Sequence, residues 1–405
     1  MKMRLLLALL LTAAIPALAQ ERPRDWEPPP VERIPNHREL WRQVVIELAT
    51  YAKKRNPNFI VLVRGGVELP VKGDREAEWD DAKDPAGLNF EKRLPLGTRF
   101  RPFLKYLDGM VFNNLYCGPY KFDKPLAQAA KARRDLDAQL ADERKKGIRR
   151  PPVPLPVGPF SIDPQEELKR SEEIKRLAEI EEHQRRILYA FDAMRDNDRT
   201  VLSIETCATQ AEADAALAAA DRDHVLSFAA ADDSKLDRLP TGHVRYENSK
   251  PVTDIAATRN WLAMVRGDRF GTRSEWVTAL TKVNFDAILI DVVHRGSDPL
   301  VKADIAAVKF KALGAPRLAL ADLPIGKAYD WRWYWQKGWE AGNPPYLFAP
   351  IAEEPGSFVA DLGDPAWKEI LGKYLKGIMD LGFDGVVLDD LDTYLWFEDL
   401  MPLTN

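Results

Sequence analysis

The feature that most constrains the fold of this chain is a short apolar segment that follows a predicted helix and ends in acidic residues. The clearest copy, residues 381–394, reads LGFDGVVLDDLDTY, where a turn at Asp384-Gly385 leads into the apolar run 386–388 and then into Asp389. The preceding residues, 365–381, have the periodicity of an amphipathic helix. An acidic surface turn is one interpretation, but this order of elements is also typical of a parallel α/β barrel.

The same pattern recurs along the chain. Eight apolar segments are predicted to be strands, and predicted helices separate most of them. Because this alternation favours a parallel sheet and eight repeats favour its closure, the sequence predicts an α/β fold, a (β/α)8 TIM barrel. The predicted strands are residues 59–63, 110–112, 200–204, 224–228, 261–265, 285–290, 317–321 and 386–388.

One segment interrupts the alternation between the second and third predicted strands. Residues 125–146 and 166–195 have the composition of charged helices, and the Pro-rich stretch 150–164 between them is predicted to be extended. We interpret 124–196 as a helical insertion in a single barrel domain, 37–405. Solvent-exposed helices are the simplest interpretation. A lid over the active-site face is the alternative, and docking to an envelope partner is a weaker one.

Acidic residues end at least four of the predicted strands. These residues are Glu205, Asp291, Asp322 and Asp389. In a barrel the carboxyl ends of the strands meet at one mouth, so the four side chains are expected to converge. Paired carboxyl groups hydrolyse glycosidic bonds, one protonating the leaving oxygen and the other acting as nucleophile or base.

An aromatic loop follows the seventh predicted strand. Its members Trp331 and Trp333 are candidates for stacking on sugar rings. Packing within the loop is the alternative role for both side chains.

The N-terminus has the features of a secretory signal peptide. A basic start precedes the apolar run 5–11, and a small-residue cleavage motif ends at Ala19. We therefore expect cleavage after Ala19, a flexible leader over 20–36, and a secreted or periplasmic protein without a membrane span.

Charge, cysteine and histidine content indicate which partners, cross-links and metal sites to expect. The net charge of −4 gives no reason to expect nucleic acid as a partner. The two cysteines, Cys117 and Cys207, can pair in an oxidising compartment, but the sequence does not decide whether they do. The five histidines have no metal-ligand spacing, so we predict no metal and no cofactor.

Several segments together resemble glycoside hydrolase family 114, the endo-α-1,4-polygalactosaminidase type of barrel. The resemblance is carried by FDGVVLDDLDTY, FDAILIDVV, RLALADLPIGKAYDWRWYW and NPNFIVLVRGGVEL, with support from LYCG and VLSIET. These segments cover most of the chain outside the leader and the insertion. The resemblance implies a TIM barrel that cleaves an amino-sugar polysaccharide, such as an exopolysaccharide of α-1,4-linked galactosamine.

The order of these segments differs from that of the family. The segment at 261–265 resembles the family's first strand, and FDGVVLD resembles its fourth. The segments that resemble strands five to eight come first in this chain. The resemblance therefore implies a circular permutation cut after the fourth strand, which a closed barrel tolerates because its first and last strands are neighbours.

The resemblance also implies roles for individual residues. Asp389 matches the family's catalytic acid after the fourth strand, and Asp291 matches the acid on the second strand. Asp392 and Tyr394 match the acid and tyrosine that follow, and Trp261 matches the opening aromatic.

Two positions depart from the family pattern. Asn113 stands where a second catalytic glutamate is expected on the sixth strand, and Lys327 replaces a glutamate after the third. Asparagine cannot serve as an acid or a nucleophile in this pairing. Either Glu205, Asp322 or Glu68 supplies the second carboxyl group, or the barrel binds sugar without cleaving it.

The leading prediction is a secreted glycoside hydrolase whose catalytic residues are Asp389 and Glu205, with Asp291 orienting a sugar or a catalytic group. A structural hydrogen-bonding role is the alternative for Asp291. The alternative function is a non-catalytic carbohydrate-binding barrel. The candidates for substrate contact are Glu68, Asn113, Tyr116, Trp261, Asp322, Trp331, Trp333, Asp392 and Tyr394.

Overall fold

The structure is a computed structural model. It describes residues 29–84, 86, 88, 93–146, 164–232, 235–240, 243–401 and 403. The predicted signal peptide and most of the predicted leader lie outside the described residues, as does most of the Pro-rich linker.

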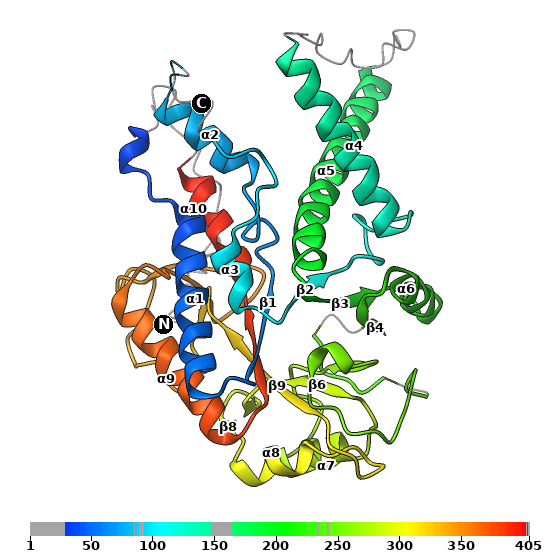
Figure 1. Ribbon diagram of the computed structural model, residues 1–405. Coiled ribbons are helices and arrows are strands. Elements are labelled where there is room, and N and C mark those ends of the chain that lie inside the picture. Colours follow the sequence, from blue (N-terminus) through cyan, green and yellow to red (C-terminus); the bar gives the residue numbers. More distant parts are fainter. Residues whose placement is uncertain are drawn as a thin grey trace, which may run out of the picture.

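An eight-stranded parallel sheet forms the centre of the molecule (Figure 1). The two outer strands of the sheet, β4 and β5, approach each other, so the sheet is a nearly closed barrel. The eight predicted strands and the α/β barrel are thereby confirmed. In spatial order the strands are β4 (Leu226–Ala231), β3 (Thr200–Cys207), β2 (Gly109–Asn113), β1 (Ile60–Arg64), β13 (Gly385–Asp389), β9 (Leu318–Pro324), β6 (Ala287–Ile290) and β5 (Trp261–Ala263).

Helices cover the outside of the barrel, and short additional strands lie in its loops (Figure 1). The helices are α1 (His37–Arg55), α2 (Asp74–Lys83), α3 (Arg101–Tyr106), α4 (Leu126–Lys145), α5 (Pro164–Arg195), α6 (Gln210–Asp223), α7 (Arg273–Thr281), α8 (Lys302–Val308), α9 (Pro365–Leu381) and α10 (Tyr394–Leu400). The additional strands are β7 (Val293–His294) with β8 (Asp298–Pro299), and β10 (Lys327–Tyr329), β12 (Ser357–Ala360) and β11 (Leu347–Pro350). No helix within the described ranges is long and apolar enough to cross a membrane.

Helix α9 shows how the sequence sets up the strand that follows it. The Asp364 side chain caps the helix by accepting from the backbone N–H of Ala366 at 2.7 Å, and Pro365 occupies its first turn. The helix ends at Gly382, whose φ of 98° favours glycine. The buried face packs on the barrel and delivers the chain into β13. That face consists of Trp367, Leu371, Tyr374, Leu375 and Ile378.

The two ends of the described chain meet in the barrel. Strands β1 and β13 pair in parallel, and α1 packs against both α9 and α10 (Figure 1). Trp41 of α1 is fully buried, and His37 stacks on Phe397 of α10 with ring centroids 4.9 Å apart. The N-terminal helix thus lies beside the helices that flank the last strand.

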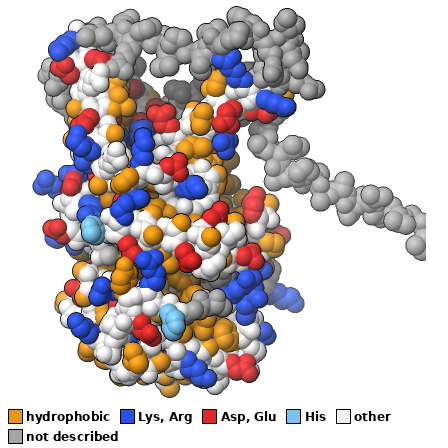
Figure 2. Space-filling view, turned by 90° about the vertical axis from the view of Figure 1, so that its right-hand side faces the viewer, with side chains coloured by type: hydrophobic (Ala, Val, Ile, Leu, Met, Phe, Trp, Pro, Cys, Tyr) orange, Lys and Arg blue, Asp and Glu red, His pale blue; other side chains and the backbone are white. Residues whose placement is uncertain are grey.

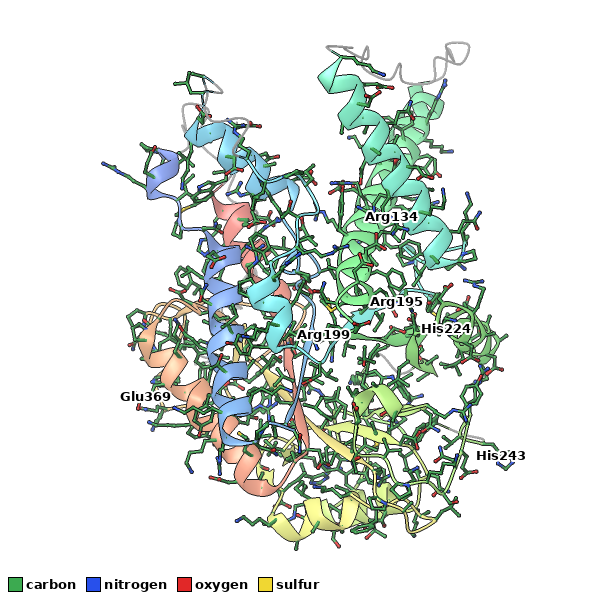
Figure 3. The ribbon with its side chains drawn as sticks, viewed as in Figure 1. Arg134, Arg195, Arg199, His224, His243 and Glu369 are labelled. Atoms are coloured by element: carbon green, nitrogen blue, oxygen red, sulfur yellow. A yellow bond between two sulfur atoms is a disulfide. The ribbon has the colours of Figure 1, made fainter. Side chains whose placement is uncertain are left out.

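The buried His37 is expected to make the stability of this contact depend on pH. Burial, aided by the charge of Arg75, lowers the pKa of His37 to about 4. The unfolded chain takes up a proton at this histidine as pH falls below its ordinary pKa, whereas the folded protein does not, so stability is lost from about pH 6.5 downward. Relative to a His37→Gln variant, the wild type should lose about 2 kcal/mol between pH 7 and pH 4.5 in urea unfolding. The exposed His243 (Figure 3), changed to Gln, is the control, and equal pH slopes for wild type and His37→Gln would refute the expectation.

Helices α4 and α5 form an arm that projects from the barrel between β2 and β3 (Figure 1). Arg133 and Arg134 of α4 both donate to Oδ2 of Asp192 on α5, at 2.7 and 2.6 Å. Figure 3 labels Arg134 on this arm. The two cysteines form a disulfide, Cys117–Cys207, at the base of the arm, with Cα atoms 5.3 Å apart. Figure 2 shows acidic and basic side chains interspersed over the face that it draws.

The disulfide closes a long loop and should therefore stabilise the protein. The two cysteines are 90 residues apart, and cross-linking restricts the unfolded chain. A Cys117→Ser, Cys207→Ser variant is expected to lose about 3 kcal/mol of unfolding free energy, measured by denaturant titration. Reductant should destabilise the wild type by a similar amount and leave the variant unchanged. An equal response of both proteins to reductant would contradict this role.

Candidate active site at the barrel mouth

A cavity of about 890 Å³ opens at the carboxyl ends of the barrel strands. Arg64 of β1, Asp291 after β6, Asp322 of β9 and Asp389 of β13 all line it. The loop after β9 and the small sheet β10–β12–β11 supply the rest of its wall. The mouth is where a parallel barrel places its ligand-binding side chains.

Strand register fixes the relative heights of the four charged residues. Arg64 lies level with Asp389 on the neighbouring strand, and Asp291 lies level with Asp322. Asp322 is in register with Val387, two residues before Asp389. Because register partners and alternate residues share a face, all four side chains point into the barrel. The Cα atoms of Asp322 and Asp389 are thus about 8 Å apart, one strand across and two residues along.

Asp389 is held by one cation and one backbone group. Its Oδ2 lies 3.0 Å from Nη1 of Arg64, and its Oδ1 accepts from the backbone N–H of Asp390 at 2.7 Å. Asp390 has a φ of 60°, so the chain turns sharply just after Asp389. The guanidinium and the backbone N–H together fix the orientation of the carboxylate.

Asp322 has a different environment from that of Asp389. It is 4% exposed, and its Oδ1 has no hydrogen-bond partner in the described part of the chain. Burial raises the pKa of Asp322 well above its ordinary value, the nearby charges of Asp389 and Asp291 raise it further, and Arg64 opposes them. Burial of this kind favours the protonated form of a carboxyl group.

Asp291 is fixed by the aromatic loop. Its Oδ1 accepts from Nη1 of Arg332 at 2.7 Å and from the backbone N–H of Val292 at 2.6 Å. Arg332 is itself buried, so the pair orders the loop against the floor of the cavity.

A second wall of the cavity carries alternating charges. Nζ of Lys327 lies 2.9 Å from Oδ1 of Asp390 and 2.9 Å from Oε2 of Glu354. Glu354 also pairs with Arg266 at 3.4 Å, and Tyr329 donates its hydroxyl proton to Asp390 at 3.1 Å. Burial and the charge of Asp389 raise the pKa of Asp390 to about 6, although Lys327 opposes this shift.

The two candidate tryptophans lie in different places. Trp331 lines the cavity, where Gly296 and Gly356 leave room for its ring and the Arg266 guanidinium lies 5.7 Å from the ring centroid. Trp333 is 56% exposed and is not among the lining residues. Only Trp331 is therefore positioned to contact a ligand in this cavity.

Glu205 points away from the cavity. Val111 of β2 is in register with Arg64, so Asn113, two residues on, faces the barrel interior. Asn113 is in register with Ile204, which leaves Glu205 on the opposite face of β3. Asn113 is exposed at the end of its strand and does not line the cavity. The structure thus brings Asp322, rather than Glu205, together with Asp389.

The Glu205 carboxylate holds the loop that follows β2. It is fully buried and accepts from the backbone N–H groups of Leu115, Tyr116 and Cys117 at 3.1, 2.9 and 3.1 Å. The Tyr116 hydroxyl donates to Asp223 of α6 at 3.2 Å, outside the cavity. These contacts anchor the loop beside the disulfide.

Glu68 and Tyr394 lie together behind the mouth. Glu68 is buried and accepts from Nη1 of Arg38 at 3.0 Å, and the Arg38 guanidinium lies 5.4 Å from the centre of the Tyr394 ring. Neither Glu68 nor Tyr394 lines the cavity.

Asp392 and Trp261 do not line the cavity but stabilise the structure around it. Oδ1 of Asp392 accepts from the backbone N–H of Gly66 at 2.6 Å and so fixes the turn after β1. Trp261 is buried and in register with Ala287, four residues before Asp291, so its ring fills the barrel beneath the cavity.

Several cavity residues are absent from the sequence-based candidates. Arg64 is a charged residue directly after a predicted strand, so its position in the sequence could have identified it as a candidate site residue. Arg266 and Asp390 likewise come directly after strand segments. Tyr329, Arg332 and Glu354 follow no predicted strand directly, and they lie in the long segment between β9 and α9. Within the described residues, no three His, Cys, Asp or Glu side chains are grouped as metal ligands would be.

Comparison with known proteins gives relatives whose names state no activity. No family model matches the chain. It is 30% identical over 147 residues to an uncharacterized protein of Deinococcus radiodurans, covering 36% of this chain and 44% of that protein. It is 28% identical over 153 residues to an uncharacterized protein of Methanocaldococcus jannaschii, covering 38% of this chain and 43% of that protein. A protein of Thermotoga maritima is 25% identical over 141 residues, or 35% of this chain and 43% of its own length. The matched part of the chain spans less than half of each relative.

Proposed function

We propose that the protein is a glycoside hydrolase in which Asp322 and Asp389 form the catalytic pair. The observation that carries the proposal is the contrast between these two carboxyl groups within one cavity. Asp389 contacts the Arg64 guanidinium, whereas Asp322 is buried and its Oδ1 lacks a hydrogen-bond partner. A buried carboxyl group with a raised pKa, beside a second carboxyl group that is paired with a cation, is an arrangement suited to glycoside hydrolysis.

The roles follow from those environments. Protonated Asp322 acts as the general acid and donates its proton to the leaving oxygen of the glycosidic bond. Ionised Asp389 acts as the nucleophile, or as the base that activates water, while Arg64 holds its orientation. Trp331 offers its ring to the apolar C–H face of a sugar, and Arg332 keeps Asp291 in place at the cavity floor.

The proposed substrate is an amino-sugar polysaccharide of the kind that the resemblance to polygalactosaminidases implies. The test is release of reducing ends from acetylated and de-acetylated galactosaminoglycan by the purified chain. Release that depends on Asp389 supports the proposal, and the absence of release from any tested polysaccharide contradicts it.

A second candidate is a carbohydrate-binding barrel without hydrolytic activity. It is favoured by Asn113, which stands at the end of β2 where the resemblance places a catalytic glutamate. This candidate requires polysaccharide binding by both the wild type and Asp389→Asn, with no bond cleavage by either.

We further propose that the chain is a circular permutation with a helical insertion, and that it is exported. The pairing of β1 with β13 meets the requirement of a permutation at this point, because the first and last barrel strands must be neighbours in the ring. The arm α4–α5 is the proposed insertion. The disulfide agrees with an oxidising compartment.

A further inference from the structure

A groove of about 480 Å³ lies at the amino ends of β3, β4 and β5, at the opposite end of the barrel from the candidate active site. Arg199 directly precedes β3, His224 lies two residues before β4, and Arg259 lies two residues before β5. Arg195, the last residue of α5, also lines the groove, and Figure 3 labels it with Arg199 and His224. Basic side chains from three separate segments of the chain thus meet around one groove.

The three arginines of the groove form no ion pair with a carboxylate of the described residues. Nη1 of Arg195 donates to the carbonyl oxygen of the last residue of α6 at 3.3 Å, and Nη2 of Arg199 donates to a carbonyl oxygen near the end of α3 at 3.5 Å. The Arg259 guanidinium lies 4.9 Å from the centre of the Tyr246 ring. Nε of Arg199 is buried and has no hydrogen-bond partner in the described part of the chain. Each guanidinium has five N–H donors, so most of these donors are unused.

The acids of the groove only partly offset the three arginines. The lining acids are Asp198 and Asp221. Asp221 pairs with Arg245, which does not line the groove, and accepts from the Tyr246 hydroxyl at 2.8 Å. Three arginines against the one remaining acid leave two positive charges. A phosphate monoester carries about −1.5 to −2 charges near pH 7, whereas a carboxylate or a phosphodiester carries a single charge, so the monoester matches the groove best.

The shape and floor of the groove also fit a phosphate ester. Guanidinium groups bind phosphate oxygens through pairs of parallel N–H donors, which a lysine cannot do. The floor is apolar, because Val201, Val225 and Ile255 line it and are buried. The volume of the groove is within the range of small-molecule sites and exceeds what a phosphate ion alone requires. The floor therefore has room for the organic part of a phosphate ester.

We infer that this groove binds a dianionic phosphate group, as the free ion or as a monoester of a small organic molecule, and that Arg199 and Arg259 are its main ligands. These two arginines precede β3 and β5, which lie on either side of β4, so they can hold a phosphate group from two sides. The inference does not depend on the proposed function, because the groove shares no lining residue with the active-site cavity.

Binding is measured by calorimetric titration of the purified protein at about pH 8, where phosphate groups are dianionic. The probes are inorganic phosphate, ethyl phosphate as a monoester, and diethyl phosphate, which carries a single charge. We expect the first two probes to bind at least about tenfold more tightly than the third. Arg199→Gln and Arg259→Gln should each weaken phosphate binding by about tenfold. Tighter binding of ethyl phosphate than of inorganic phosphate would identify an organic ligand, and any other order of these two would identify the free ion.

The control is Arg33→Gln. Arg33 is exposed in the short helix η1 (Val31–Arg33) and does not line the groove, so this change removes one positive charge elsewhere and should leave phosphate binding unaltered. The thermal unfolding midpoint of each variant shows whether it is folded. Absence of phosphate binding by the wild type overturns the inference, and so does wild-type affinity in folded Arg199→Gln and Arg259→Gln. Equal binding of ethyl and diethyl phosphate overturns the assignment of a dianion.

Discussion

Asp389→Asn is expected to abolish hydrolysis, with kcat/KM reduced by about ten-thousandfold. Asparagine keeps the shape of the side chain, but it has one acceptor oxygen where aspartate has two, so it retains only one of the contacts with Arg64 and the Asp390 N–H, and it can neither attack the sugar nor activate water. Reducing-end release from the polysaccharide measures the effect. An aryl glycoside with a good leaving group should not restore activity, because the missing step is nucleophilic rather than acidic.

A variant at the other end of the same strand separates chemistry from folding. The Asp384 carboxylate accepts from the backbone N–H of Ala319 at 3.0 Å and pairs with Lys309 at 2.6 Å. Asp384→Asn should lower stability with less than a tenfold effect on kcat/KM, since surface-side pairs do not touch the cavity. If Asp384→Asn and Asp389→Asn lose activity in proportion to their loss of stability, the catalytic role of Asp389 is refuted.

The fold could be predicted because its signals are local. Each barrel strand is a short apolar run, and the helix boundaries follow from caps such as Asp364 and Gly382. Predicted helices at 125–146 and 166–195 agree with α4, Leu126–Lys145, and α5, Pro164–Arg195. The small sheet β10–β12–β11 was missed because its strands are short and lie within long loops.

The site was harder to predict because it depends on register and on distant pairs. Glu205 and Asp322 both follow apolar runs, but β3 and β9 continue past them, so a shift of one residue decides which side chain faces the interior. The partner of Asp389 is Arg64, which lies near the opposite end of the chain and becomes a neighbour only through the pairing of β1 with β13. No periodicity in the sequence reports that contact.

Asp322→Asn is expected to lower kcat/KM for the polysaccharide by about a thousandfold, because the leaving oxygen would depart without a proton. In contrast to Asp389→Asn, this variant should regain most of its activity on an aryl glycoside whose leaving group needs no protonation. The alkaline limb of the wild-type pH–rate profile, which reports loss of the acid's proton, should disappear in the variant. A polysaccharide activity close to that of the wild type would exclude Asp322 as the general acid and leave Asp390 and Glu354, which also line the cavity, as the carboxyl groups to test.

Asp322→Asn, which is expected to lower activity, should increase the stability of the protein relative to the wild type as pH rises. The raised pKa of Asp322 means that folding takes up a proton at this position once pH exceeds the ordinary pKa of an aspartate. The wild type therefore loses stability as pH rises through that window, whereas the variant has no group to titrate there. Denaturant unfolding at about pH 5 and pH 8 measures the effect. The free energy of unfolding of Asp322→Asn, relative to that of the wild type, should be larger at pH 8 than at pH 5. A buried acid that weakens the fold at working pH is typical of a functional site, so loss of activity together with a gain in stability would place Asp322 in the site, and the recovery on an aryl glycoside would then identify it as the acid.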